Sequence, residues 1–175
     1  MRRSASTAFL GLVSALVFAP ALAFAAFTKT GTPQVTFLAT GPGGLKIEGK
    51  TSELNVAEEG GNVKISVPLA NVDTGINLRN KHMREKYLET DKFPNAELTV
   101  ARSALQLPED GKEVSGTANG QLTIHGQTKP VAVRYTNRRS GKTYDVQGST
   151  RVNMNEYGVT VPSYLGVTVI GAGFL

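Results

Sequence analysis

The sequence contains no cysteine and no tryptophan, and it has only two histidines among its 175 residues. The missing cysteines exclude disulfide bonds, thiolate metal sites and attachment of a lipid to an N-terminal cysteine. The folded protein therefore depends on the burial of apolar side chains. The roughly 150 residues that follow the leader described below are enough for one ordinary domain with its own core.

Residue patterns that support catalysis or metal binding are missing as well. His82 falls in a charged segment and His125 on the polar side of an alternating run, so a surface position is the simpler interpretation for each. No serine lies in a nucleophile-elbow motif, no metal-ligand spacing occurs, and the carboxylates fall in turns or in the charged segment. We therefore predict a protein that is not an enzyme and has neither a metal nor a cofactor.

A large excess of one charge is also absent. The 19 basic and 14 acidic residues give a formal net charge of +5, and removal of Arg2 and Arg3 with the leader lowers it to +3. An excess of this size does not indicate a nucleic-acid partner. It is compatible with a solvated basic surface, or with a weak preference for anionic lipid head groups.

The first 25 residues have the composition of a cleaved secretory signal peptide. Arg2 and Arg3 provide a positive start, residues 8–19 are apolar and nearly uncharged, and small residues allow cleavage within residues 23–26. The apolar run is shorter than the roughly 20 residues that a membrane-spanning helix needs. We therefore expect an exported protein, periplasmic or secreted, in which residues 26–175 form a single domain.

Apolar residues alternate with polar ones through most of this domain. In residues 62–70, Val63, Ile65, Val67 and Leu69 recur at every second position, as in a strand with one buried face. There are about eight such runs, the number at which a closed antiparallel barrel just encloses a small ligand. A two-sheet sandwich fits the same alternation, so the runs alone leave both architectures open.

The only long interruption of the alternation runs from Val72 to Pro94. Its central part is rich in Leu, Arg, Lys, Met and Glu and contains no glycine or proline, which predicts one short helix at about residues 77–89. The side-chain oxygen of Asn77 or Thr74 is expected to cap the start of this helix.

Two of the strand-like runs carry small residues on their apolar side. Gly116, Ala118 and Gly120 alternate in the first run, and Gly148 lies among larger apolar residues in the second. A glycine in a strand marks a bend of the sheet, or it leaves internal volume for something else to occupy. Both interpretations stay open, and the recurrence in two runs favours an internal cavity.

Three segments resemble the YceI-like family. Val72–Pro94 contains Asp-Thr-Gly, then an Arg and a His at the family's spacing, and ends in an aromatic-Pro pair. Gly120–Val133 (GQLTIHGQTKPVAV) is similar to the family's G-x-L-T-I-H-G-x-T-K-P-V run, and Val152–Val159 resembles its I-N-R-x-x-F-G-I segment. Asn80 stands where the family usually has Asp, and Met154 where Arg is common. These differences bear on the ligand rather than on the fold.

The resemblance implies an all-β, lipocalin-like antiparallel barrel with one short helix. Its lumen would hold a polyisoprenoid or a similar long-chain amphiphile, as a carrier or buffer. The charged residues of the helix themselves allow two interpretations: a solvated face, or a position of Arg79 or His82 at the barrel mouth, where it would meet the polar head of a ligand. We expect the lumen to be lined by inward-facing residues of the strands: Phe37, Ile65, Val67, Leu69, Leu98, Leu122, Ile124, Val133, Tyr135, Val146, Val152, Val167 and Val169.

The same reasoning sets the expected partners. A long-chain lipid is the first, transient contact with a membrane is compatible with it, and a dimer is compatible with the sequence. The alternative function is that of a ligand-free β-domain that acts through contacts with other proteins of the cell envelope.

Overall fold

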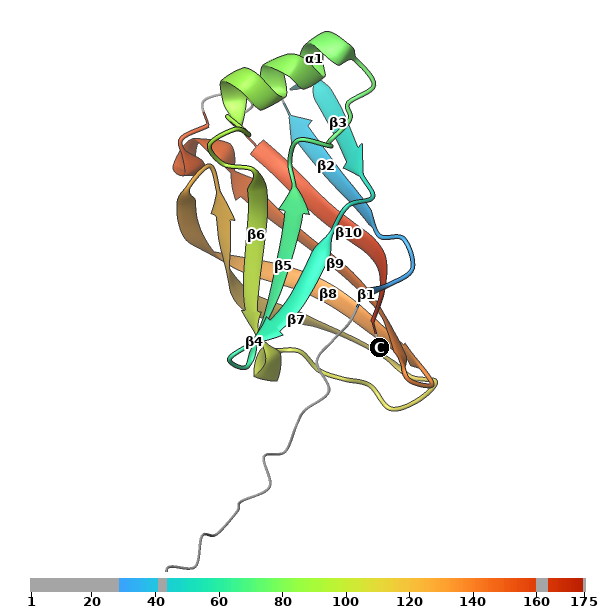
Figure 1. Cartoon of the computed structure of the whole chain (residues 1–175). Helices are drawn as coiled ribbons and strands as arrows, with labels where there is room; N and C mark the ends of the chain where they lie inside the picture. The colour runs from blue at the N-terminus through green and yellow to red at the C-terminus, as the bar shows by residue number, and fades with distance from the viewer. Residues whose placement is uncertain (1–28, 41–43, 160–163, 175) are drawn as a thin grey trace, which may run out of the picture.

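The computed structural model describes residues 29–40 and 44–159, together with the backbone of residues 164–174 (Figure 1). The predicted leader, residues 1–25, lies outside this part of the chain. The described strands are β1 (Lys29–Thr30), β2 (Gln34–Thr40), β3 (Lys46–Thr51), β4 (Asn55–Glu59), β5 (Asn62–Pro68), β6 (Asn95–Ala101), β7 (Glu113–Ile124), β8 (Gln127–Ser140), β9 (Thr143–Asn153) and β10 (Tyr164–Phe174). The helical elements are α1 (Asn77–His82), the π-helical turn η2 (Met83–Tyr87) and the 3-10 turns η3 (Arg102–Ala104) and η4 (Met154–Tyr157).

All of these strands belong to one antiparallel sheet. Its order is β3-β2-β10-β9-β8-β7-β6-β5-β4, and β1 pairs with β10. The sheet curls so that β4, β5 and β6 face β2, β10 and β9 across the interior (Figure 1). The predicted all-β barrel-like fold with one short helix is therefore confirmed, and a single sheet is incompatible with the two-sheet sandwich.

The two ends of the sheet are consecutive in the chain. β3 and β4 follow one another, yet they form opposite ends of the strand order. Near this seam, Lys50 of β3 forms an antiparallel bridge with Asp73, with N–H to O distances of 2.8 and 2.9 Å. The segment between β5 and α1 is thus hydrogen-bonded to the end of β3.

The sheet contains a strand, β4, that the sequence did not predict. β4 was not expected because its residues, NVAEE, include only two apolar side chains and the strand lies at the end of the sheet. Only Gly60 and Gly61 connect β4 to β5. Both glycines have positive φ angles, 56° and 77°, as a two-residue hairpin turn requires.

The helical segment lies across one end of the barrel, the end toward which β2 and β5 run (Figure 1). α1 and η2 together cover residues 77–87, so the predicted helix at about 77–89 is confirmed to within two residues. The predicted cap is wrong. The residue at the cap position is Ile76, and no side chain there accepts a hydrogen bond from the helix.

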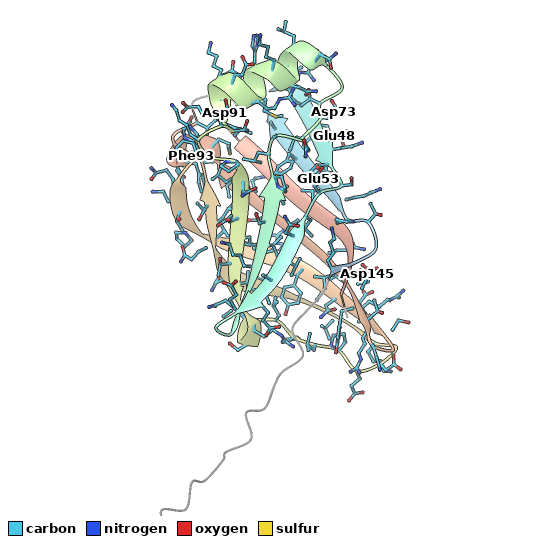
Figure 2. All side chains as sticks on the ribbon, viewed as in Figure 1. Glu48, Glu53, Asp73, Asp91, Phe93 and Asp145 are labelled. Carbon is cyan, nitrogen blue, oxygen red and sulfur yellow. The ribbon has the colours of Figure 1, made fainter. Side chains whose placement is uncertain are left out.

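Asn80 organises the start of the helix instead. Its Oδ1 accepts hydrogen bonds from the backbone N–H of Thr74, at 2.8 Å, and from the Thr74 hydroxyl, at 2.7 Å. Its Nδ2 donates to Oδ1 of Asp73 at 2.7 Å. Figure 2 shows Asp73 directly below the helix, at the top of the barrel. The turn before α1 is therefore fixed by a buried amide from inside the helix.

Buried apolar side chains form three clusters rather than one continuous core. The first lies at the helix end of the barrel and includes Leu69, Val72, Ala96, Leu122, Ile124, Val152, Met154, Tyr157 and Val159. The second contains Val35, Leu54 and Val67, and the third contains Val100, Ala118 and Tyr135. Members of each cluster also line the cavity inside the barrel.

Candidate functional site

An inner cavity of about 150 Å³ occupies the middle of the barrel. Its wall is almost wholly apolar. It is lined by residues of the curled sheet and of the segments that precede β4 and follow η3: Phe37, Leu54, Val56, Val63, Ile65, Val67, Ala96, Leu98, Val100, Leu105, Leu107, Ala118, Leu122, Ile124, Val133, Tyr135, Asn137, Tyr144, Val146, Gly148, Ser149 and Thr150. Apolar cavities of this kind hold water poorly and favour an apolar ligand. The alternating strands therefore build a hydrophobic compartment.

A second, outer cavity of about 400 Å³ lies between α1 and the end of the barrel. Phe37, Ala96 and Ile124 line both cavities, so the two are adjacent. The helix adds both apolar and charged side chains to the outer wall: Ile76, Leu78, Arg79, His82, Met83, Tyr87 and Leu88. A long molecule that filled both cavities would thus have an apolar inner part and an outer part close to charged groups.

Most of the predicted lumen residues line one of these cavities. The inner cavity is lined by nine of them: Phe37, Ile65, Val67, Leu98, Leu122, Ile124, Val133, Tyr135 and Val146. Leu69 lines the outer cavity. Val152 packs instead in the core cluster at the helix end and contributes to neither cavity wall. The side chains of Val167 and Val169, on β10, lie outside the described part of the chain.

The two predicted head-group residues lie at the outer cavity. Arg79 and His82 both belong to α1 and both line this cavity. Nη1 of Arg79 lies 3.5 Å from the carbonyl oxygen of Thr74, a weak contact that leaves most of the guanidinium donors available. Contact of either residue with a ligand head stays a prediction.

The glycines of the two small-residue runs differ in what surrounds them. A Cβ added at Gly116 would lie 2.9 Å from the Tyr135 hydroxyl, so the room left by this glycine is filled by a tyrosine ring. At Gly120 an added Cβ would lie 2.7 Å from the carbonyl oxygen of Thr99, which indicates close approach of β6 and β7. Only Gly148 agrees with the cavity interpretation, because it lines the inner cavity and its nearest neighbour would be at 3.7 Å.

The segment after β6 closes the end of the barrel opposite α1. The Tyr135 hydroxyl accepts a hydrogen bond from the Gln106 backbone N–H at 2.9 Å, and Nδ2 of Asn137 donates to the Gln106 carbonyl at 2.9 Å. Leu105 and Leu107, on either side of Gln106, line the inner cavity. Two residues of β8 therefore hold a floor in place beneath the cavity.

The sequence did not predict this floor, nor the contribution of Asn137 to holding it. Asn137 lies on the inward face of β8, two positions after Tyr135, so the period-two alternation includes it. It was not predicted because its side chain is polar. Leu105 and Leu107 follow β6 outside any strand, where alternation carries no information. Oδ1 of Asn137 is buried and has no hydrogen-bond partner within the described part of the chain.

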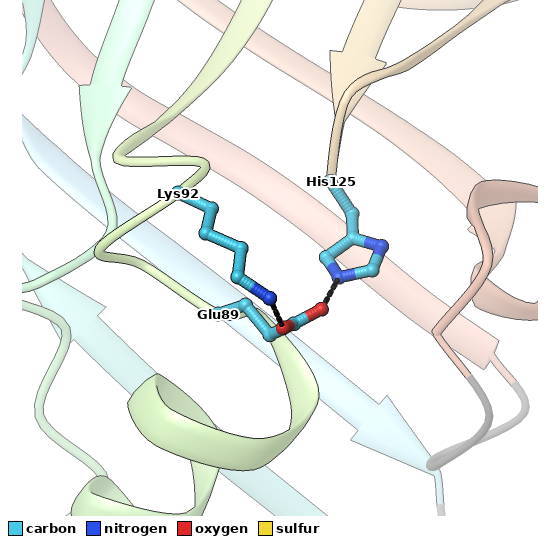
Figure 3. Close-up of polar contacts among 3 residues, drawn as sticks. All are labelled: Glu89, Lys92 and His125. Atoms are coloured by element: carbon cyan, nitrogen blue, oxygen red, sulfur yellow. Dashed lines mark hydrogen bonds and ion pairs between the residues drawn. The ribbon is translucent and has the colours of Figure 1, made fainter.

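A polar cluster connects the end of the helical segment to the turn between β7 and β8 (Figure 3). Oε2 of Glu89 lies 2.8 Å from Nε2 of His125, and Oε1 forms an ion pair with Lys92. The hydrogen bond with Lys92 has the larger effect, and the one with His125 the smaller, in holding the pKa of the Glu89 carboxyl below its ordinary value. The His125 ring also packs on Phe93, with ring centroids 4.6 Å apart.

His125 is therefore not the surface residue expected from its sequence context, since its side chain is only 16% exposed. The sequence signal was available in the neighbouring Gly126, because a tight turn there rotates His125 inward. Both residues have positive φ angles, 50° and 72°. Among the described residues, no group of three or more His, Asp or Glu side chains is arranged to hold a metal ion.

Comparison with known families identifies the fold type. A family model described as the YceI-like domain matches residues 26–172. Two curated relatives are UPF0312 proteins. The one from Pseudomonas fluorescens is 31% identical over 120 residues, covering 64% of this chain and 60% of the relative. The one from Photorhabdus laumondii is 34% identical over 91 residues, covering 51% and 43%. The matched segments thus span less than two thirds of these relatives.

Solved structures share the fold at low sequence identity. A polyisoprenoid-binding domain from Saccharophagus degradans superimposes with a TM-score of 0.72 at 18% identity, covering 85% of this chain and 97% of that domain. BcnA from Burkholderia cenocepacia gives a TM-score of 0.62 at 16% identity, covering 81% of this chain and 94% of BcnA. The predicted family resemblance is confirmed by these comparisons. Since the family model covers nearly all of the chain after its first 25 residues, this protein belongs to the YceI-like family.

Proposed function

We propose that this protein binds a polyisoprenoid or a similar long-chain amphiphile inside the barrel and acts as a carrier or buffer, not as an enzyme. The observation that carries the proposal is the apolar inner cavity that adjoins an outer cavity with charged residues at its wall. An apolar inner cavity followed by an outer cavity with charged residues matches an amphiphile that has a long apolar tail and a polar head. The similar fold of the polyisoprenoid-binding domain from Saccharophagus degradans supports the same ligand class.

The energetics favour a carrier, which exchanges its lipid with a membrane, over a protein that binds the lipid so tightly that it does not release it. Burial of each methylene from water contributes about 0.8 kcal/mol, so several isoprene units provide ample driving force for uptake from water. The natural source of such a lipid is a membrane, whose tails are as apolar as the cavity wall. Transfer between bilayer and barrel is then close to neutral in hydrophobic terms. Selectivity must come from the size of the cavities and from contacts of the head group with Arg79 or His82.

Export belongs to the same proposal. A protein that exchanges lipid between membranes outside the cytoplasm needs the signal peptide expected at residues 1–25. The mass of the protein recovered from a secreting host measures the cleavage directly. We expect a new N-terminus within residues 23–26, and recovery of the uncleaved chain from the cytoplasm would contradict export.

The decisive experiment is native mass spectrometry of gently purified protein. We expect a bound species with the mass of a long-chain lipid, which lipid extraction releases and added prenyl alcohol or prenyl phosphate replaces. A protein that is consistently ligand-free and also refuses these lipids would overturn the proposal. In that case the ligand-free, protein-contacting β-domain becomes the better account.

A further inference from the structure

Two large apolar side chains are exposed where the chain enters α1. Ile76 is 49% exposed and Leu78 is 63% exposed, and both also line the outer cavity. A third, Leu45, is 57% exposed and lies two residues before Ile47, which lines the same cavity. Exposed leucines and isoleucines that rim the mouth of an apolar cavity are costly in water. Their position marks a contact surface rather than a random patch.

Basic residues accompany these apolar side chains. α1 and η2 contain four basic residues, Arg79, Lys81, Arg84 and Lys86, and one acidic residue, Glu85. At the opposite end of the barrel, residues 108–113 and 138–145 contain four basic and four acidic residues. The positive excess of the helical segment therefore has no counterpart in these two segments at the opposite end.

The acidic residues beside the helix reduce this positive excess but do not remove it. Asp73 accepts hydrogen bonds from two neutral donors, Nδ2 of Asn80 and the Gly75 backbone N–H, so it keeps its negative charge and offsets one positive charge. Glu89 is compensated by its ion pair with Lys92. Asp91 is exposed on the turn beyond η2, and it offsets one positive charge (Figure 2).

One arginine is fixed in place. Nη1 of Arg84 donates to the Ala70 carbonyl at 2.9 Å, which holds this guanidinium at the rim of the barrel. Lys81 and Lys86 are exposed and face solvent. A rigid basic side chain at the rim, with flexible lysines beside it, suits attraction to phosphate groups spread over a surface.

The helical segment is short, and none of the helices in the described part of the chain is long and apolar enough to cross a membrane. A short helix with exposed apolar residues and a basic flank has the features of an element that lies in a membrane interface. We define the cap surface as Ile76, Leu78, Lys81, Arg84 and Lys86.

From this geometry we infer that the cap surface docks on an anionic phospholipid bilayer. The basic residues contact the lipid phosphates, while Ile76 and Leu78 insert between the head groups. The outer cavity then opens toward the acyl chains, so a lipid passes between bilayer and barrel without crossing water. This inference rests on the proposed lipid-binding function and adds to it the partner surface and the route of loading.

Vesicle flotation tests the inference with the full mature chain. We use vesicles of phosphatidylcholine with and without phosphatidylglycerol, at low and at physiological salt. Binding is expected only with phosphatidylglycerol, and it should weaken as salt screens the charges. Because a basic residue near such a surface contributes roughly five-fold to binding, the double variant Lys81→Glu/Lys86→Glu should lose about 30-fold or more.

Matched control variants test whether vesicle binding depends on the cap surface itself or on any change of charge or apolar character in the protein. The double variant Lys112→Glu/Lys142→Glu makes the same charge change at the opposite end of the barrel, and it should bind like the unmodified protein. Leu78→Ser should weaken binding several-fold, whereas Leu38→Ser, at a residue that is 42% exposed on β2, should not. Thermal melting of every variant shows whether it is folded.

The outcomes distinguish this inference from the proposed function. Equal losses from the two double variants, equal binding to neutral vesicles, or no binding at all would overturn docking. In the last case a protein partner would have to cover the cap surface. Native mass spectrometry of the same samples reports lipid content independently. Lipid-loaded protein that ignores vesicles contradicts docking alone, and empty protein that binds vesicles contradicts the carrier function alone.

Discussion

A single buried amide fixes the turn at the entrance to the helix. Asn80 makes three hydrogen bonds, to both Thr74 donors and to Asp73, and it is only 6% exposed. Each bond contributes about 0.5–1.5 kcal/mol, and truncation of Asn80 removes all three. We therefore expect Asn80→Ala to lower the free energy of unfolding by about 2–3 kcal/mol, as measured by urea denaturation.

Asn77 provides the matched control for this prediction. It is exposed at the first position of α1 and was expected from sequence to cap the helix, but no side-chain cap is present there. Asn77→Ala should therefore change the free energy of unfolding by no more than about 0.5 kcal/mol. Equal effects of the two substitutions would show that Asn80 does not organise the turn.

Substitutions at Gly116 and Gly148 distinguish loss of packing from loss of space for a ligand. Gly148→Val adds a side chain to the wall of the inner cavity, so we expect ligand loading to fall while stability is retained. Gly116→Val forces the Tyr135 ring out of place, which should cost about 1–3 kcal/mol of stability. Native mass spectrometry measures loading, and urea denaturation measures stability. Unchanged loading of the Gly148→Val protein would place the ligand elsewhere.

At the scale of elements, Glu89 joins the end of the helical segment to the turn between β7 and β8 (Figure 3). Lys92 first, and His125 second, lower the pKa of Glu89 from its ordinary value of 4.5. A carboxyl whose pKa is lower in the folded state stabilises the fold above its unfolded pKa. That contribution is lost as the pH falls below about 4.5 and through the lowered folded pKa.

We therefore expect Glu89→Gln to change the acid side of the stability profile. The melting temperature of the unmodified protein should fall more steeply below pH 4.5 than that of the variant, because only the carboxylate loses favourable contacts on protonation. Melting curves recorded from neutral to acidic pH measure the two slopes. Parallel curves would mean that the contacts of Glu89 with Lys92 and His125 contribute nothing to stability.

The strands and the helix could be predicted because their patterns are local. In β5, β7 and β8, apolar residues recur at every second position, and the curled sheet buries that face. The two-residue strand β1 and the half-polar β4 were missed, because their pairing depends on a neighbouring strand rather than on their own residues. The cap failed for a related reason, since the hydrogen bonds of Asn80 reach six and seven residues back along the chain.

The candidate site was predictable only in part. Nine lumen residues follow from alternation, whereas the floor at Leu105 and Leu107 lies outside any strand and depends on bonds from Tyr135 and Asn137. The role of Gly116 could not be inferred, since the ring that fills its space comes from the neighbouring strand. Sequence patterns identify which face of a strand is buried, but not what fills the space in front of it.

At the scale of the whole molecule, the barrel keeps internal volume that a tightly packed protein would fill. An empty cavity costs about 24 cal/mol per Å³, so the inner cavity of about 150 Å³ corresponds to roughly 3–4 kcal/mol of stability. A chain without disulfides has no covalent compensation for this loss. A bound lipid restores the missing contacts, and ligand binding and folding stability should therefore be coupled.

This coupling can be measured by thermal unfolding of lipid-free protein before and after addition of a prenyl alcohol. A ligand at 100 times its dissociation constant stabilises a protein by about 2.7 kcal/mol, which raises the melting temperature of a domain of this size by roughly 5–10 °C. The Gly148→Val protein should show a smaller rise, because its inner cavity is partly filled. If the unmodified protein shows no rise, the internal volume is not a prenyl-lipid site. An equal rise in both proteins would mean that the lipid binds outside the inner cavity.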